Sequence, residues 1–356
     1  MHAVVLAGGP GSRFWPASRG HTPKPFVRLA GQETLFAATL ERLAPLCPPA
    51  RTWVVAARPL ARTARSALRG WQGVHLLLEP EARNTAAAIA WAAASVLALD
   101  EEALLGVFPA DHHIGRPAGF RRCLAGAARS ARRDDALVLV GVEPDGPDTA
   151  YGYLRVGRAG ASASAPVERF VEKPDLARAR RYLRQGNYLW NAGMLVAPAA
   201  LVLEETRRHA PEVWKALGRV LEATAEGHRV SRATLERAWR RVRPISFDHA
   251  VLERSDRVRA VRGRFGWSDV GSWHSVGPRL PGSAGNRVLG GSELVAVDSR
   301  DNIVWNETEQ TIALVGLEGH VVVNTPDALL VCPQERAQDV RRVVDELRRR
   351  RRGDLL

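Results

Sequence analysis

Short apolar runs alternate with amphipathic stretches over the first 145 residues of the chain. The runs have the length and composition of buried strands and lie at 2–7, 51–57, 74–79, 104–109 and 136–142. The stretches between them carry apolar residues at helical spacing and lie at 33–44, 59–70, 84–100 and 117–133. This alternation predicts a mostly parallel sheet with helices on its faces, whose ligands gather at the carboxyl ends of the strands.

The pattern changes twice farther along the chain. Strands are expected at 151–156, 167–172 and 188–197, and helices at 176–185, 199–208, 211–223 and 231–241. From 284 to 332 short strands recur every eight to ten residues, separated by Gly, Asn and Asp, and a helix at 334–350 follows. We therefore expect an α/β fold with a Rossmann-like, mostly parallel mixed sheet at 1–280 and a small β-rich, β-helix-like part at 281–356.

Composition excludes several classes of protein. A hydrophobic content of 46% with 25% charged residues is ordinary for a globular protein. No apolar run reaches the 18 residues of a membrane span, and the N-terminus lacks a basic region typical of a signal peptide. Cys47, Cys123 and Cys332 have no metal-ligand spacing. We expect a cytoplasmic protein with reduced thiols and no membrane partner.

The charge is strongly basic and almost entirely arginine. The chain has 51 Lys+Arg against 38 Asp+Glu, and only Lys24, Lys173 and Lys215 are lysines. A GC-rich genome accounts for this ratio, so a retained lysine indicates a site that arginine does not suit. The run 348–352 is interpreted as a solvated terminus, with contact to an acidic partner or a neighbouring subunit as the alternative. No RNA-binding, zinc-finger or helix-turn-helix motif is present, so no nucleic acid is expected as a partner.

A glycine-rich loop follows the first strand. It reads LAGGPGSRFWP at 6–16, and Pro23-Lys24 comes shortly after it. Glycines let backbone N–H groups approach a phosphate closely, and Arg13 adds a positive charge. Neither the P-loop spacing nor the dinucleotide-binding spacing is present. The loop therefore predicts a phosphate site of another type.

The loop resembles the signature of sugar-1-phosphate nucleotidyltransferases, LAGG-x-G-[ST]-R-[LF]-WP followed by PK-x-F. The variant with Trp15-Pro16 is similar to that of the mannose-1-phosphate guanylyltransferases. Further segments agree in order: EPEARNTAAA at 79–88, FPADH at 108–112, TAYGYL at 149–154, FVEKP at 170–174, YLWNAGM at 188–194, SFDHAVLE at 246–253 and WSDVGSW at 267–273.

The resemblance implies transfer of GMP from GTP to mannose 1-phosphate, which gives GDP-mannose and pyrophosphate. The sugar phosphate is already ionised at neutral pH because its second pKa is about 6, so the chemistry needs no general base. It needs in-line positioning and neutralisation of the leaving pyrophosphate. Arg13 and Lys24 would neutralise the nucleotide phosphates, and Asp111 and Asp269 would hold Mg²⁺. A transition-metal site at His112 and His113 is less favoured, because adjacent side chains do not share a face.

The resemblance also implies binding residues. The nucleotide is expected at Leu6, Ala7, Gly8, Gly9, Gly11, Ser12, Arg13, Glu79, Asn84, Thr85 and Asp111, with Glu79 accepting from guanine donors. Backbone carbonyls would serve the guanine equally well. The sugar phosphate is expected at Gly152, Glu172, Lys173 and Asn191.

Two departures from the family pattern leave alternatives open. Pro25 stands where the family usually has Gln, and Ala192 stands where Ser is commoner. Proline has no N–H, so another hexose or heptose 1-phosphate, or another NTP, remains an alternative. A non-catalytic regulatory paralogue is the alternative from another class, and a homodimer is a possible assembly. Longer relatives append an isomerase domain, so we expect no isomerase activity.

Overall fold

The computed structural model describes residues 1–356 except 10, 30–32, 159–162, 284 and 291–292. Contacts divide the chain into two units that interleave along the sequence. We call them the sheet unit (Met1–Ala7, Glu41–Ala110 and Ile114–Trp267) and the loop–coil unit (Gly8–Leu40, Asp111–His113 and Ser268–Leu356). No helix among the described residues is both long and apolar enough to span a bilayer.

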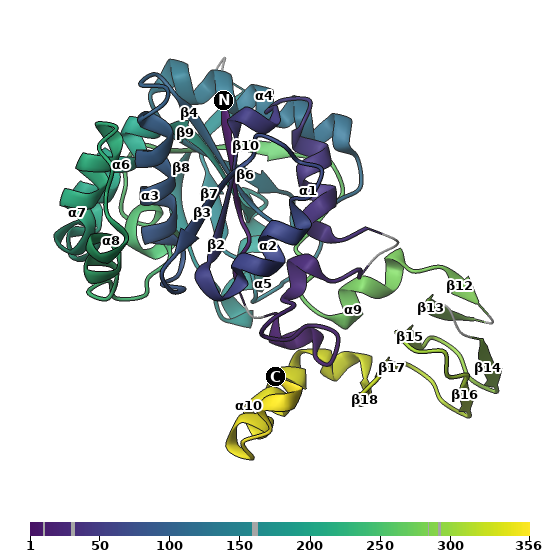
Figure 1. Ribbon diagram of the computed structural model, residues 1–356. Helices are drawn as coiled ribbons and strands as arrows, with labels where there is room; N and C mark the ends of the chain where they lie inside the picture. The colour runs from purple at the N-terminus through teal and green to yellow at the C-terminus, as the bar shows by residue number, and fades with distance from the viewer. Residues whose placement is uncertain (10, 30–32, 159–162, 284, 291–292) are drawn as a thin grey trace. The chain divides into compact units, whose positions relative to one another are not determined.

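A nine-stranded mixed sheet forms the centre of the sheet unit, in the order β3-β2-β1-β4-β9-β6-β10-β8-β7 (Figure 1). The strands β3, β2, β1 and β4 are parallel, as the alternating pattern predicted. Between β4 and β6 the long strand β9 runs antiparallel to both. The strand bounds are β1 His2–Leu6, β2 Thr52–Ala57, β3 His75–Glu79, β4 Leu104–Pro109, β6 Leu137–Val142, β7 Tyr153–Val156, β8 Ser164–Val171, β9 Tyr188–Pro198 and β10 Val258–Gly263.

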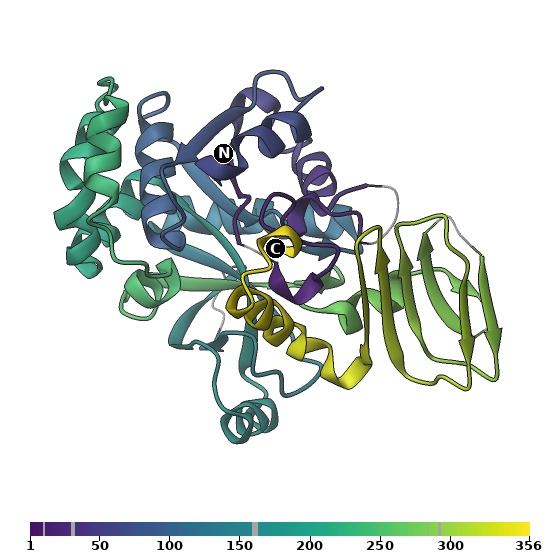
Figure 2. The same ribbon diagram turned by 60° about the horizontal axis from the view of Figure 1, so that its bottom comes forward.

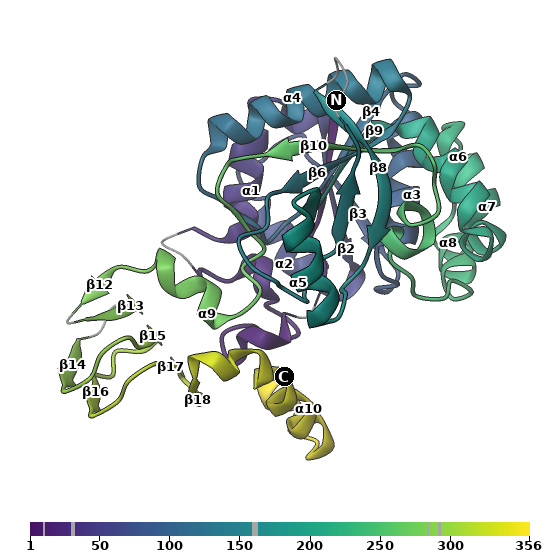
Figure 3. The same ribbon diagram turned by 180° about the vertical axis from the view of Figure 1, so that it is seen from behind.

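Helices cover both faces of this sheet (Figure 3). Residues of β4 alternate between the faces: Val107 belongs to the core beneath α3, and Phe108 meets Phe120 of α4 at 6.2 Å between ring centroids. Helix α3 also packs against α6 and α7. The helix bounds are α2 Ala61–Ala67, α3 Thr85–Leu97, α4 Pro117–Asp134, α5 Leu176–Gln185, α6 Ala199–His209, α7 Pro211–Ala225 and α8 Arg232–Trp239. The α/β fold expected from the sequence is confirmed.

The elements of the sheet unit that were not predicted from the sequence include a strand and a helical turn. One is β10, whose sequence VRAVRG interleaves arginines with apolar residues. The other is a π-helical turn at Asp248–Leu252, in the segment SFDHAVLE. A single turn of this kind gives no periodic signal, although π-turns are frequent at functional sites.

The C-terminal part of the loop–coil unit is a parallel β-coil (Figure 2). Its strands β13, β15 and β17 pair in parallel, as do β14 and β16, and β18 closes the stack antiparallel to β17. The β-helix-like part expected from the sequence is therefore confirmed. The strand bounds are β12 Gly282–Ser283, β13 Asn286–Gly290, β14 Leu294–Val297, β15 Ile303–Asn306, β16 Ile312–Val315, β17 His320–Thr325 and β18 Ala328–Pro333.

Buried asparagines join successive turns of the coil. Asn302 is fully buried, and both its backbone N–H and its Nδ2 donate to Asn286 Oδ1, at 3.0 and 2.9 Å. Its Nδ2 also donates to the Leu317 carbonyl at 2.7 Å, and its Oδ1 accepts from the His320 N–H at 2.8 Å. These bonds satisfy turn backbone that the strands leave unpaired.

The helix predicted over 334–350 is two elements. A 3₁₀ segment, η7 Gln334–Asp339, precedes the helix α10 Val340–Arg349. Val340 and Val344 pack in one core with Phe14 and Trp15, so α10 lies against the 3₁₀ turn η1 Ser12–Phe14 (Figure 2). The remaining elements are α1 Leu35–Leu43, η2 Lys24–Phe26, η3 Pro49–Arg51, η4 Arg58–Leu60, β5 His113–Ile114, β11 Trp267–Ser268, α9 Trp273–Val276, η6 Gly277–Arg279 and η8 Gly353–Leu355.

Candidate active site

The predicted phosphate and metal residues line one pocket within the loop–coil unit. The pocket has a volume of about 480 Å³. Its lining combines residues of the glycine-rich loop, the two predicted aspartates and helix α10: Gly11, Ser12, Arg13, Phe14, Lys24, Asp111, His112, Asp269, Gly271, Arg341, Asp345 and Arg348. We call it the phosphate pocket. Residues from the two ends of the chain are thereby brought together in one place.

The glycine-rich loop approaches Lys24 closely. Gly9 has φ 98° and Gly11 has φ 56°, conformations that favour glycine. A Cβ on Gly11 would lie 2.7 Å from Lys24 Cβ and 2.6 Å from Ser18 Oγ, so a side chain would not fit there. Gly8 and Gly9 have open space beside their backbone. The loop therefore packs on Lys24 at one end and leaves bare backbone at the other.

Lys24 is a buried cation with well-defined partners. Only 6% of the residue is exposed, and Nζ donates to Asp111 Oδ2 at 2.7 Å and to the Asp269 carbonyl at 2.5 Å. The ammonium also lies 5.7 Å from the centroid of the Phe14 ring. A compact ammonium suits this crowded position better than a planar guanidinium.

Asp111 follows β4, at the carboxyl end of the strand, as predicted. Burial, the largest single influence, raises the pKa of its carboxyl, but the charges of Lys24 and His112 and the hydrogen bonds to the carboxylate together hold that pKa below its usual value. The carboxylate is therefore ionised at neutral pH. Lys24 donates to Oδ2, and Asp111 also lines the phosphate pocket.

Asp269 and Gly271 form a narrow cradle on the same pocket. A Cβ on Gly271 would lie 2.7 Å from Asp269 Oδ2, so glycine leaves the space that this carboxylate occupies. Arg13 Nη1 donates to the Gly271 carbonyl at 3.2 Å, which holds the guanidinium on the pocket wall. Arg13, Lys24, Asp111 and Asp269 thus converge as the sequence led us to expect.

The donor set fits a magnesium ion better than a transition metal. No cluster of three or more His, Cys, Asp or Glu with ligand geometry occurs among the described residues. Two carboxylates alone suit Mg²⁺, which keeps waters and takes its other ligands from substrate phosphates. His112 lines the pocket, yet no histidine-containing ligand cluster forms within the described ranges.

Helix α10 contributes three residues that sequence reasoning missed. Arg341, Asp345 and Arg348 recur at helical spacing and line the phosphate pocket. The spacing i, i+4, i+7 was visible in the sequence. The sequence did not distinguish these arginines from their neighbours, because other faces of the same helix also carry arginine.

The predicted sugar residues lie close together in the sheet unit. A Cβ on Gly152 would lie 2.6 Å from Glu172 Oε2 and 3.4 Å from Asn191 Cβ, so a side chain there would displace the Glu172 carboxylate from its present position. Asn191 lies on β9, and Glu172 follows β8. Lys173 is exposed, has φ 45° and donates to Glu172 Oε1 at 2.5 Å.

Asp248 joins this group and was not among the predicted site residues. Asn191 Nδ2 donates to Asp248 Oδ1 at 2.9 Å, and Asn191 Oδ1 accepts from the Gly193 N–H at 3.1 Å. These two bonds fix which end of the amide is donor and which is acceptor. Burial, and next the nearby Glu172 carboxylate, raise the pKa of Asp248 to about 6. The segment SFDHAVLE was the available sequence signal, but the aspartate in it was assigned no role.

The three predicted base-binding residues belong to the sheet unit, where one ends a strand and two lie at the start of a helix. Glu79 ends β3, and burial raises the pKa of its carboxyl to about 8. Asn84 caps α3, since its side chain accepts from the Thr85 N–H at 2.9 Å. Thr85 Oγ1 accepts from the Phe247 N–H at 2.8 Å. Asn84 and Thr85 therefore have structural bonds, and Glu79 is neutral at pH 7.

Leu6 and Ala7 use part of their backbone in the sheet. The Leu6 carbonyl accepts from the Ala110 N–H at 3.2 Å, and the Ala7 N–H donates to the Val55 carbonyl at 2.8 Å. Those groups are not available to a nucleotide, which leaves the Ala7 carbonyl and the glycines beyond it.

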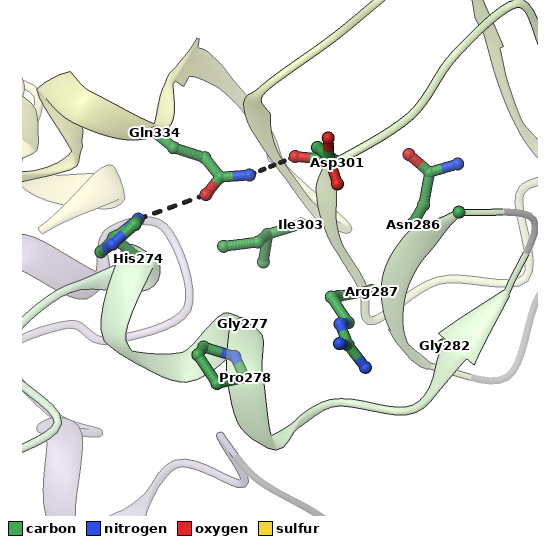
Figure 4. A pocket seen from close by; sticks show the side chains of 10 residues that line it. His274, Gly277, Pro278, Gly282, Asn286, Arg287, Asp301, Ile303 and Gln334 are labelled. Atoms are coloured by element: carbon green, nitrogen blue, oxygen red, sulfur yellow. Dashed lines mark hydrogen bonds between the residues drawn. The ribbon is translucent and has the colours of Figure 1, made fainter.

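A second pocket of about 600 Å³ lies in the loop–coil unit and holds none of the predicted residues (Figure 4). His274 Nδ1 lies 3.2 Å from Gln334 Oε1, and Gln334 Nε2 donates to the Asp301 carbonyl. Asn286, which also lines this pocket, belongs to the asparagine stack of the coil. Much of its polar lining is thus bonded within the unit.

The chain is similar to known proteins over nearly its whole length. Residues 2–277 match the family model described as Nucleotidyl transferase, and residues 292–347 match the MannoseP isomerase/GMP-like beta-helix domain. The alginate biosynthesis protein AlgA of Pseudomonas aeruginosa is 37% identical, over 98% of this chain and 72% of its own length. A mannose-1-phosphate guanylyltransferase of Klebsiella pneumoniae is 35% identical, over 99% of this chain and 74% of its own.

A solved structure extends this likeness to the fold. A protein of Thermus thermophilus, described as a mannose-1-phosphate geranyltransferase, superposes with a TM-score of 0.86 at 39% identity. The match covers 98% of this chain and 99% of that one. The chain therefore belongs to the nucleotidyl transferase family, among the relatives of the mannose-1-phosphate guanylyltransferases.

Proposed function

We propose that this chain transfers GMP from GTP to mannose 1-phosphate and releases pyrophosphate. The observation that carries the proposal is the phosphate pocket, where Arg13, Lys24, Asp111 and Asp269 converge beside the glycine-rich loop. Two cations and two carboxylates in one pocket suit a polyphosphate with its metal.

The residues of the pocket act by position and charge. The sugar phosphate supplies an oxygen that is already ionised at pH 7, because its second pKa is about 6. That oxygen attacks the α-phosphorus, and the bond to the bridging oxygen of pyrophosphate breaks. Lys24 and Arg13 neutralise charge that develops on the phosphates, and both are held in place before the reaction. Preorganised charge of this kind costs no rearrangement in the transition state.

We assign a Mg²⁺ ion to Asp111 and Asp269. These two carboxylates would hold the ion, which would supply positive charge to stabilise the phosphates during transfer. The Lys24 ammonium keeps Asp111 ionised, and Gly271 leaves room for the Asp269 carboxylate. The Asp111 carboxylate is thereby ready to accept the ion at neutral pH.

Gly152, Glu172, Asn191 and Lys173 are proposed to bind the sugar phosphate. The carboxylate and the oriented amide suit sugar hydroxyls, and Lys173 suits the phosphate. The guanine is assigned to Glu79 with Asn84 and Thr85 beside it. A neutral Glu79 carboxyl offers one donor and one acceptor, which complements guanine O6 and N1–H.

The remaining assignments are proposals from the sequence. The domain division at 1–280 and 281–356 is supported by the two family models, which match 2–277 and 292–347. Cytoplasmic location and a homodimer stay predictions.

Pyrophosphate release from a panel of four NTPs and several sugar 1-phosphates tests the proposal. We expect GTP with mannose 1-phosphate to be the best pair. The panel also tests Pro25, which is buried in η2 beside Lys24 where relatives usually carry Gln. Preference for a heptose 1-phosphate or another NTP would overturn the specificity but keep the enzyme class. No release above background with any pair would overturn the function.

The variant Asp111→Asn tests the metal assignment. It keeps the side chain's shape but removes its charge, so we expect release to fall to background. The melting temperature should fall as well, because the buried Lys24 ammonium loses its counter-charge, and measurements are made where the variant is still folded. Near-normal turnover would overturn the assignment. A matched control is Asp301→Asn, which removes a carboxylate from an exposed position outside the phosphate pocket.

A further inference from the structure

Helix α10 adds two arginines to the phosphate pocket, and neither belongs to a sequence motif of the family. Arg341 and Arg348 line it together with Asp345, and all three lie on one face of the helix. Arg342 and Arg349 lie one position farther along, outside the lining of this pocket. One face of this arginine-rich helix therefore lines the pocket.

The position of α10 is set by apolar packing and does not depend on these arginines. Val340 and Val344 belong to the core that contains Phe14 and Trp15. Trp15 Nε1 also donates to the Leu355 carbonyl at 2.9 Å, which ties the segment after the helix to the loop. The same loop residues thus lie next to Arg13 and support α10, so the helix is held beside the phosphate-binding loop.

Charge in the pocket is unevenly distributed with depth. The deep cation, Lys24, is 6% exposed and already bonded to Asp111, whereas the Arg348 side chain is 56% exposed. Among the residues that the structure describes, Arg348 pairs only with Asp345 of its own helix, at 3.1 Å, and an exposed pair of this type is weak. Within the described residues Arg341 has no hydrogen-bond or ion-pair partner. Two guanidiniums are therefore available at the open end.

We propose that Arg341 and Arg348 bind the β- and γ-phosphates of the nucleotide and the pyrophosphate that leaves. This rests on the proposed function, which puts the reacting α-phosphate near Lys24 and the metal carboxylates. The distal phosphates then extend toward the open end of the pocket. A guanidinium forms paired hydrogen bonds to phosphate oxygens, and these bonds are stronger than neutral ones. Asp345 competes with the phosphates for Arg348.

Direct binding of ligands to the full chain tests the proposal without requiring turnover. Magnesium pyrophosphate, GTP and GMP are titrated by calorimetry into the unaltered protein and into Arg341→Gln and Arg348→Gln. We expect each variant to weaken pyrophosphate and GTP about tenfold. GMP lacks the distal phosphates, so its affinity stays within about twofold. Equal weakening of GMP, or no weakening of pyrophosphate, would overturn the proposal.

Matched control variants distinguish an effect of the position of these arginines from an effect of the net charge of the helix. Arg342→Gln and Arg349→Gln remove the same charge from the same helix outside the pocket, so we expect pyrophosphate affinity within about twofold of the unaltered protein. A loss as large as that of Arg341→Gln would mean that only net charge matters, and would overturn the proposal. Asp345→Asn removes the competitor of Arg348, so pyrophosphate should bind more tightly. Weaker binding in that variant would also contradict it.

These outcomes are distinguishable from failure of the proposed function. The protein could bind pyrophosphate through Arg341 and Arg348 but release none from GTP with any sugar 1-phosphate. That result would support the role of the two arginines and overturn the proposed function. With both arginines replaced, the protein could turn over normally and bind pyrophosphate with unchanged affinity. That result would support the proposed function and overturn the role of the two arginines.

Discussion

Lys24 Nζ lies 2.7 Å from Asp111 Oδ2, although 87 positions separate the two residues in the chain. The pair places a buried ammonium against a carboxylate proposed to hold the metal. It also explains why a chain with so few lysines keeps one here. A guanidinium is larger and planar, and the space around Lys24 is closed by Gly11, Phe14 and the Asp269 carbonyl.

Lys24→Arg is therefore expected to reduce kcat/KM by about 100-fold, because the guanidinium must displace either the glycine-rich loop or Asp111. Lys215→Arg makes the same chemical change at an exposed helix position and should leave activity unchanged. Pyrophosphate release gives the rates, and thermal melting shows whether either variant is misfolded. Near-normal kcat/KM in Lys24→Arg would mean that the position tolerates any cation.

Gly271→Ala is expected to raise the Mg²⁺ concentration needed for half-maximal activity by about tenfold. The new Cβ would lie 2.7 Å from Asp269 Oδ2, so the carboxylate must turn away from its place in the pocket. Activity at saturating Mg²⁺ should recover in part. The control is Gly353→Ala, where a Cβ meets nothing within 4 Å. An unchanged Mg²⁺ dependence in Gly271→Ala would count against a metal role for Asp269.

Asp248→Asn is expected to raise KM for mannose 1-phosphate about tenfold while KM for GTP stays unchanged. The new amide can turn an NH₂ group toward Asn191 Nδ2, and the Asn191 amide then loses its fixed orientation. Kinetics are measured above pH 7.5, because both Asp248 and the sugar phosphate titrate near pH 6. Equal rises in both KM values would indicate a general structural effect and not a role in placing Asn191.

Glu79 should make stability fall as pH rises. Burial raises its pKa from 4.5 to about 8 in the folded chain. Below pH 4.5 the carboxyl is protonated in both states, and between pH 4.5 and 8 only the unfolded chain loses the proton. The stabilising contribution is thus complete below pH 4.5 and lost by about pH 8.

Glu79→Gln removes this titration, so its stability relative to the unaltered protein should increase steadily from pH 5 to 8. Urea unfolding at a series of pH values measures the difference. The exposed Glu102→Gln serves as the matched control and should show a flat difference. A flat difference for Glu79→Gln as well would mean that the buried carboxyl has an ordinary pKa.

Asn302→Ala should destabilise the β-coil by about 3 kcal/mol, because the hydrogen-bonding groups of Asn286, Leu317 and His320 lose a buried partner. Chemical unfolding monitored by tryptophan fluorescence measures the loss. Glu309→Ala, on an exposed loop of the same coil, should change stability by less than about 0.5 kcal/mol. Equal stability of the two variants would show that the asparagine stack is dispensable.

The sequence by itself determined the strands and helices of the parallel half-sheet and the β-rich C-terminal part. Those elements follow from local apolar periodicity, which a buried strand or an amphipathic helix must show. It also determined the family, because ordered motifs such as LAGG, EKP and WNAGM each carry a local chemical requirement. The scarcity of lysine drew attention to Lys24 and Lys173 as phosphate-binding positions, and the structure shows Lys24 buried beside Asp111.

Only the tertiary structure decided which distant residues share a site. The strand β10 and the antiparallel course of β9 depend on pairing between remote segments, which local patterns do not encode. Asp248 acquires its partner Asn191 through a π-turn with no periodic signal. The selection of Arg341 and Arg348 from a run of arginines depends on which face of α10 packs against the glycine-rich loop. Burial of Val340 and Val344 fixes the orientation of the helix, and this orientation determines which arginines line the pocket.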